Sequence, residues 1–175
     1  MDWLLRDGFV GLGVEGCGGA FRIGPLATPT LTARPRAAYG LVVCAAPAYL
    51  AERGTPLTPA DLEHHECLGY AYWSRPADPE WSFYEGSILH KGRVSSRLQV
   101  NESKALMSAA LDGFGMVLGP QDFLLPALER GELVRLLPDF AAPSRQMHLL
   151  YTANRQRTAK LRRFVEAVLL RFGPP

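Results

Sequence analysis

The residues best placed to bind a ligand are Asn101, Glu102 and Ser103, which come just before an apolar segment with helical spacing. Asn101 is the predicted N-cap, because its side-chain oxygen can accept a hydrogen bond from an unpaired N–H of the first turn. A helix start that follows a strand can also hold an anionic or polar group of a ligand. Glu102 suits the helix dipole but disfavours a bare anion. Capping alone explains Asn101, so both interpretations stay open.

The segment that must position these residues runs to Pro120. Gly113 is expected to end the helix in a left-handed conformation. The next four apolar residues, 115–118, are too few for a helix and predict a buried strand, which Gly119 and Pro120 should end because proline cannot donate to a sheet ladder. The apolar stripe of the helix consists of Leu106, Met107, Ala110, Leu111 and Phe114.

The rest of the chain alternates between predicted strands and helices, which is typical of an α/β domain. Short helices are expected from Pro47 to a stop at Gly54 and from a Thr58 N-cap, with Asp61 at N3, to about His65. Pro126 should restart a helix that begins after Pro120 and ends at Gly131, and Thr158 should cap a closing helix. The predicted strands are 20–24, 31–46, 67–73, 81–84, 93–100, 133–137 and 146–152.

A glycine-rich stretch contains Gly11-x-Gly13-x-x-Gly16, which formally matches a dinucleotide-binding fingerprint. That chemistry needs a buried strand before the glycines and a helix that opens at them, so that backbone N–H groups meet the pyrophosphate. Here a strand-like segment follows instead of a helix. A surface loop is therefore the favoured interpretation, and no cofactor is expected.

Two further patterns lack the partners that their chemistry requires. His64-His65-x-Cys67 could begin a zinc site, but a structural zinc needs four ligands and no second cysteine or histidine pair follows. Ser108 and Ser144 have no nucleophile-elbow motif and no evident base. We therefore expect neither a metal site nor an enzyme.

The composition limits which classes of protein the chain can belong to. The 175 residues are 47% hydrophobic and 21% charged, as in soluble globular domains, and the net charge of +2 does not by itself indicate a nucleic-acid surface. No run approaches the ~18 apolar residues of a membrane span, and no secretory signal is evident. Cys17, Cys44 and Cys67 are odd in number and widely spaced, which favours reduced thiols. We expect a cytoplasmic protein.

The order of several segments resembles the effector-binding domain of LysR-type transcriptional regulators. The segment around Asn101 matches the family pattern of an asparagine, a helix, Gly-x-Gly and a Leu-(Gly)-Pro end. Other segments follow in the family's order; together they are LLRDGF, AFRIG, LVVCAAPAYLAERGTPLTPADLEHHECLGY, the Trp-x-Phe strand, RLQVNESKALMSAALDGFGMVLGP, ALERGELVRLLPDF and MHLLYTANRQRTAKLRRFVEAVL. The resemblance spans nearly all of residues 2–172.

That resemblance implies a two-lobed fold similar to type 2 periplasmic binding proteins, with a small effector between the lobes. Residues 1–42 and 137–175 would form lobe I, and residues 43–136 would form lobe II. By the same resemblance, the winged helix-turn-helix domain, the linker helix and the first strand–helix–strand of lobe I are missing, and glycines are inserted before residue 20. We expect a truncated regulator, with lobe I incomplete and no DNA-binding residue of its own.

The resemblance places the start of the 101–120 segment at the cleft, so Asn101, Glu102, Ser103 and Pro120 are candidate ligand-binding residues. Arg22, near the end of a predicted strand, could reach the cleft mouth, although a solvated arginine is the commoner case. Tyr70 and Tyr72 alternate with apolar neighbours, so one of them could line the cleft or simply pack. The partners implied are a small-molecule effector, weakly bound if half the cradle is missing, and a homodimer or swapped oligomer.

Two other functions remain as alternatives. A stand-alone solute-binding protein of a transporter shares the fold type but requires export, which the absent signal peptide argues against. An accessory oxidoreductase would use the glycine-rich loop, and stabilisation by NAD or FAD in a thermal-shift assay would reveal it. The favoured function is control of transcription through effector binding, in which a ligand shifts the population of lobe arrangements.

Overall fold

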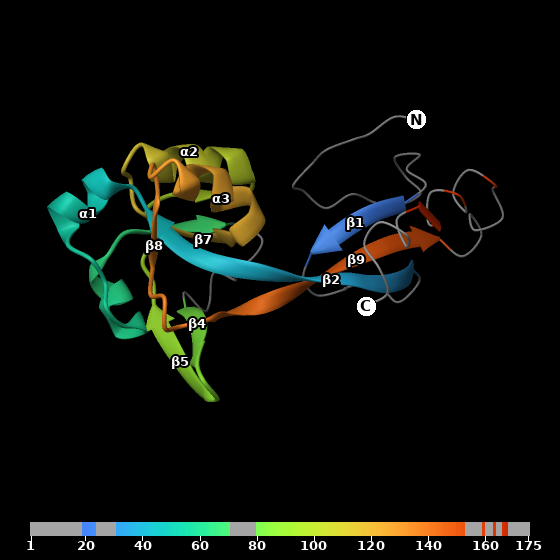
Figure 1. Cartoon of the computed structure of the whole chain (residues 1–175), viewed down its shortest axis with the longest axis horizontal. Helices are drawn as coiled ribbons and strands as arrows, with labels where there is room; N and C mark the ends of the chain where they lie inside the picture. The colour runs from blue at the N-terminus through green and yellow to red at the C-terminus, as the bar shows by residue number, and fades with distance from the viewer. Residues whose placement is uncertain are drawn as a thin grey trace. The chain divides into compact units, whose positions relative to one another are not determined.

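The computed structural model describes residues 19–23, 31–70 and 80–152, together with Ala159, Arg163, Glu166 and Ala167. The chain divides into two compact units (Figure 1). The first contains Gly40–Pro143, and the second contains Phe9–Tyr39 and Ser144–Pro175.

The first unit is built on a mixed sheet. In this unit β7 pairs antiparallel with β2 and parallel with β3, and β3 pairs parallel with β6. The strand β8 pairs antiparallel with β2, on the side away from β7. The strands are β2 (Leu31–Ala45), β3 (Cys67–Tyr70), β6 (Gln99–Val100), β7 (Met116–Pro120) and β8 (Val134–Leu136).

Both faces of this sheet are covered, and neighbouring residues of each strand point to opposite faces. On one face, Val117 packs with buried side chains of α2 and α3, two helices that lie together on one side of β7 (Figure 1). On the other face, Met116 packs with Tyr49, Leu62 and Phe83 from three further elements. The helices are α1 (Pro47–Arg53), the 3-10 helix η1 (Pro59–His64), α2 (Ser103–Leu111) and α3 (Gln121–Glu129).

A two-stranded hairpin, β4 (Glu80–Glu85) with β5 (Ile88–Arg93), supplies the second core with Trp81 and Phe83. The hairpin approaches η1 so closely at Gly92 that a Cβ atom there would collide with the carbonyl of Pro59. Glycine is therefore required at this position by packing and not by its backbone angles.

The second unit contains β1 (Gly19–Ile23), which pairs antiparallel with β9 (Ala142–Thr152), and β9 neighbours β2. Both β2 and β9 are shared between the units, since the unit boundaries fall within these strands. In the β1–β9 register, Arg22 is opposite His148.

Many predicted elements are confirmed. Pro47 is the first residue of α1, and Gly54 ends it with a φ of 82°. Thr58 begins η1, with Asp61 reaching back to the Thr58 N–H over 2.8 Å. The predicted strands at 20–24, 31–46, 81–84, 133–137 and 146–152 correspond to β1, β2, β4, β8 and β9, and 67–70 to β3.

Two predictions about the extent of strands and helices were wrong. Residues 93–100 do not form one strand. The strand β5 ends at Arg93, only Gln99–Val100 are in β6, and a mixture of backbone and side-chain hydrogen bonds holds the residues between them. Pro126 does not restart a helix, because α3 continues through it. Proline has no N–H to donate to the preceding turn, and the burial of Leu124 and Ala127 in the core offsets that loss.

Several predictions fall outside the described residues. These are the segment before residue 19 with its glycine-rich stretch, the part of the predicted 67–73 strand beyond Tyr70, which includes Tyr72, and most of the closing helix. Within the part of the chain that the structure describes, no helix is long and apolar enough to cross a membrane.

Candidate functional site

The candidate site lies where parallel strands end and two helices begin. Because β3 and β7 are parallel, their last residues, Tyr70 and Pro120, lie at the same edge of the sheet. Helix α3 starts at Gln121, directly after β7, and α2 starts at Ser103, shortly after β6. The carboxyl edge of parallel strands is where open α/β sheets bind ligands.

A small hollow, part of it open to solvent, lies at this edge. Most of its lining is apolar, with the tyrosine and serine side chains as the hydroxyl groups, which is the usual character of a small-molecule site. The lining residues are Tyr70, Ser103, Leu106, Met107, Val117, Leu118, Gly119, Pro120, Phe123 and Leu124.

The cap of α2 is Glu102, so the prediction that Asn101 caps this helix was wrong. One carboxylate oxygen of Glu102 accepts from the Lys104 N–H at 3.0 Å, and the other accepts from the Ala105 N–H at 2.7 Å. Glu102 has an extended backbone, which makes Ser103 the first helical residue. A carboxylate of the chain itself therefore occupies two of the donors that a helix start offers.

Asn101 has a different role in the structure. Its backbone carbonyl accepts a hydrogen bond from the Tyr70 hydroxyl at 3.3 Å. This contact joins the end of β3 to the chain just before α2. Asn101 and Glu102 are themselves exposed at the surface.

The structure brings Tyr70, Ser103 and Pro120 together in the lining of one hollow, with Asn101 and Glu102 adjacent along the chain. Arg22 belongs to β1, in the other unit. Sequence reasoning missed the contributions of Phe123 and Leu124. A signal was present, because a helix that starts after Gly119-Pro120 must direct its first apolar residues toward the same edge.

Two residues of the rejected zinc pattern, His65 and Cys67, contact other groups of the chain. The Nδ1 atom of His65 lies 3.2 Å from the Tyr49 hydroxyl, and the Cys67 thiol donates to the Leu62 carbonyl over 3.8 Å. Burial raises the pKa of Cys67 to about 12, which disfavours the thiolate that binds metals. Among residues 19–23, 31–70 and 80–152, no three His, Cys, Asp or Glu side chains gather as a metal site would require.

Comparison with known proteins identifies the class. The family model for the LysR substrate binding domain matches residues 16–172. The HTH-type transcriptional regulator PtxR of Pseudomonas aeruginosa is 30% identical over 173 residues, 99% of this chain and 55% of that protein. An HTH-type transcriptional regulator of Haemophilus influenzae is 30% identical over 157 residues, 90% of this chain and 54% of that protein. The chain thus spans about half the length of these relatives.

Solved structures agree in fold. The regulatory domain of CrgA, a LysR-type regulator from Neisseria meningitidis, matches with a TM-score of 0.80 and 24% identity, over 95% of this chain and 80% of that one. The full-length virulence activator AphB of Vibrio cholerae matches with a TM-score of 0.75 and 25% identity, over 92% of this chain and 54% of that one.

These matches define an α/β domain with a periplasmic-binding-protein-like fold, as the sequence predicted. The chain belongs to the LysR substrate-binding-domain family, whose members are parts of transcriptional regulators.

Proposed function

We propose that this chain binds a small-molecule effector and thereby controls transcription, with the hollow at the ends of β3 and β7 as one wall of the effector site. The observation that carries the proposal is the convergence of Tyr70, Ser103 and Pro120 from three separate elements on one hollow. Ligands of open α/β sheets bind at the edge where strand ends and helix starts meet, which supports this location.

The lining indicates how a ligand would be held. Apolar side chains would take up its hydrocarbon surface, while the Ser103 and Tyr70 hydroxyls would fix the orientation of one polar group. Because Glu102 already occupies the N–H groups of Lys104 and Ala105, a neutral polar group fits this wall better than a bare carboxylate. Asn101 would act through its hydrogen bond with Tyr70, and we retain Arg22 as a proposed contact.

The proposed mechanism is a population shift. Residues 1–42 and 137–175 would act as one lobe and residues 43–136 as the other, and an effector that prefers one lobe arrangement would raise its population. In a cytoplasmic homodimer, that change would alter how helix-turn-helix domains are presented to DNA. A ligand with no difference in affinity between the arrangements would have no effect.

The proposal is tested by ligand screening with ¹⁵N-labelled protein. A panel of small neutral and anionic compounds would be titrated while the backbone amide signals are followed. We expect the binding compounds to move the amides of Ser103, Gly119 and Phe123 together. Ser103→Ala and Tyr70→Phe should each weaken binding by about fivefold to tenfold, as expected for losing one hydrogen bond.

Matched controls separate site effects from general ones. Ser87→Ala, in the exposed turn between β4 and β5, and Tyr84→Phe, on an exposed position of β4, remove the same groups elsewhere in the first unit. Compounds that move amides only at distant positions, or that bind both variants of the hollow like the wild type, would contradict the proposed site.

A further inference from the structure

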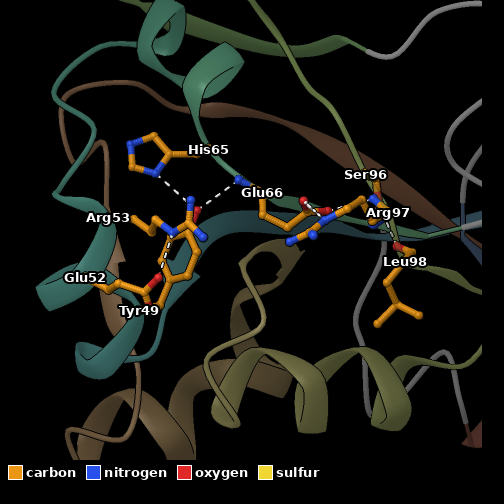
Figure 2. Close-up of polar contacts among 9 residues, drawn as sticks. Tyr49, Glu52, Arg53, His65, Glu66, Ser96, Arg97 and Leu98 are labelled. Carbon is orange, nitrogen blue, oxygen red and sulfur yellow. Dashed lines mark hydrogen bonds and ion pairs between the residues drawn. The ribbon is translucent and has the colours of Figure 1, made fainter.

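Glu66, the residue just before β3, connects three parts of the first unit (Figure 2). Its backbone N–H donates to the Tyr49 hydroxyl of α1 at 2.9 Å. Its carbonyl accepts from the N–H of Met116, the first residue of β7, at 2.8 Å. The main chain of Glu66 is thereby fixed from both sides before its side chain is considered.

The Glu66 carboxylate holds the chain segment that leads into β6. One of its oxygens accepts from the backbone N–H of Arg97 at 2.6 Å, and the other accepts from the Arg97 Nε at 2.8 Å. The two side chains differ in exposure, with 17% of Glu66 and 81% of Arg97 accessible to solvent. Since exposed ion pairs contribute little, the bond to the backbone N–H should be the stronger restraint.

Further bonds extend this attachment along β3. The Gly69 N–H donates to the Ser96 hydroxyl at 3.0 Å, and the same hydroxyl donates to the Leu98 carbonyl at 2.6 Å. A Cβ atom at Gly69 would lie 2.9 Å from the Cγ of Gln99, so the two segments touch closely. Backbone bonds contribute as well, because the Cys67 N–H donates to the Ser95 carbonyl and the Gly69 N–H donates to the Leu98 carbonyl, each at 3.0 Å. The segment 95–98, which has no regular strand of its own, is thus held against β3 by both backbone and side-chain hydrogen bonds.

This segment leads directly to the hollow. After Leu98 the chain passes through β6 and reaches the Glu102 cap and Ser103 within five residues. The position at which α2 begins therefore depends on where the segment 95–98 is anchored. The attachment formed by Glu66, Arg97 and Ser96 is here called the β3 clamp.

We propose that Glu66 is a positioning residue for the effector site: through the β3 clamp it fixes the start of α2 and hence the Ser103 hydroxyl. It does this chiefly as an acceptor for the Arg97 backbone N–H and only secondarily through the ion pair. The role rests on the proposed function insofar as Ser103 contacts an effector, but the clamp itself can be tested without any ligand.

The test is amide hydrogen exchange in Glu66→Ala, Glu66→Gln and Arg97→Ala. The Leu106 N–H, which bonds to the Glu102 carbonyl at 3.2 Å, reports on the first turn of α2, and the Ala127 N–H of α3 serves as an internal reference. In Glu66→Ala, exchange at Leu106 relative to Ala127 should rise about tenfold, corresponding to about 1.4 kcal/mol of lost coupling. Glu66→Gln, which keeps one acceptor, should give a smaller rise, and Arg97→Ala the smallest.

A matched control is Glu80→Gln, which removes a glutamate charge from the Glu80–Lys91 pair of the hairpin and should leave the Leu106 to Ala127 ratio unchanged. An equal increase at both amides would show that Glu66 only stabilises the unit as a whole, and would overturn the proposal. A rise in Arg97→Ala as large as in Glu66→Ala would overturn the assignment to the backbone bond. Failure of every compound to bind at Ser103 would refute the effector site and leave the clamp standing.

Discussion

Two helices of the first unit, η1 and α2, begin with a carboxylate bound to two backbone N–H groups, yet only α2 opens onto a hollow. At η1, Asp61 reaches back to Leu57 and Thr58 at 2.9 and 2.8 Å. At α2, Glu102 reaches forward to Lys104 and Ala105. The same local chemistry thus lies over a filled core at η1 and beside the proposed effector site at α2.

The difference arises from what packs beneath each helix. Leu62 of η1 has no exposed surface and meets Cys67 and Phe83 in a filled core, with Gly92 of β5 pressed against Pro59. Leu106 of α2 is also buried, but it lines the hollow. The space beside α2, and not its cap, therefore distinguishes it from η1.

The largest expected effect compares those two leucines. Leu62→Ala should lower the free energy of unfolding by about 3–5 kcal/mol, because it leaves a sealed void in a filled core. Leu106→Ala should cost about 2–3 kcal/mol, because the space left joins an opening that solvent already reaches. Urea unfolding of both variants, followed by tryptophan fluorescence, measures the two values. Equal losses would mean that the hollow is as well packed as the η1 core.

A smaller effect is expected at the caps. Glu102→Ala removes both cap bonds and should cost about 0.5–1 kcal/mol of stability, and it exposes the N–H groups of Lys104 and Ala105. Sulfate should then bind the helix start about twofold to fivefold more tightly than it binds the wild type. An NMR titration with sodium sulfate tests this. Glu102→Gln is the control, since it retains a cap oxygen; a gain in sulfate binding only in Glu102→Gln would contradict the occupied-donor explanation.

The smallest expected effects concern the pH dependence of stability, which should differ between Asp61 in η1 and the neighbouring His65. The backbone N–H groups of Thr58 and Leu57 hold the pKa of Asp61 below its usual value of 3.8. That stabilisation is present above pH 3.8 and disappears as the pH falls through the lowered folded pKa. Asp61→Asn should therefore flatten the loss of stability at the acid end and leave stability near pH 6 little dependent on pH at this site.

For His65, stability changes over a different pH range. Burial lowers its pKa from the usual 6.5, so the unfolded chain takes up a proton before the folded chain does. Stability should consequently decline as the pH falls below 6.5 and level off below the lowered folded pKa. His65→Gln should remove that decline without changing the loss of stability at acid pH that Asp61 causes. Thermal unfolding between pH 3 and pH 8 measures both, and identical profiles for the two variants would contradict the separate assignments.

Sequence patterns predicted those parts of the structure that local preferences determine. Pro47 and Gly54 bound α1 because each suits one end of a helix irrespective of its surroundings. Gly113 likewise follows α2 with a φ of 79°. The run 115–118 was correctly assigned to a buried strand, because a short apolar run fits a covered sheet.

The errors occurred where distant contacts override local preference. Asparagine is a good cap in general, but the hydrogen bond from Tyr70 ties the Asn101 carbonyl to the end of β3, and the helix starts one residue later. The alternating pattern after Arg93 predicted a strand, whereas that segment is fixed by the Glu66 side chain and by backbone bonds to β3, both distant in sequence. The hollow was only partly predictable, because its floor depends on how α3 packs on β7.

Two buried cysteines of the described part of the chain, Cys44 and Cys67, can report on motions at the two faces of the sheet. Cys44 packs on the side of α2 and α3, and Cys67 packs on the side of η1 and the hairpin. Burial raises the pKa of each thiol to about 12, so neither reacts while its layer is in place. Alkylation rates at the two positions, resolved by mass spectrometry, would therefore measure how often each layer opens, with no residue substituted.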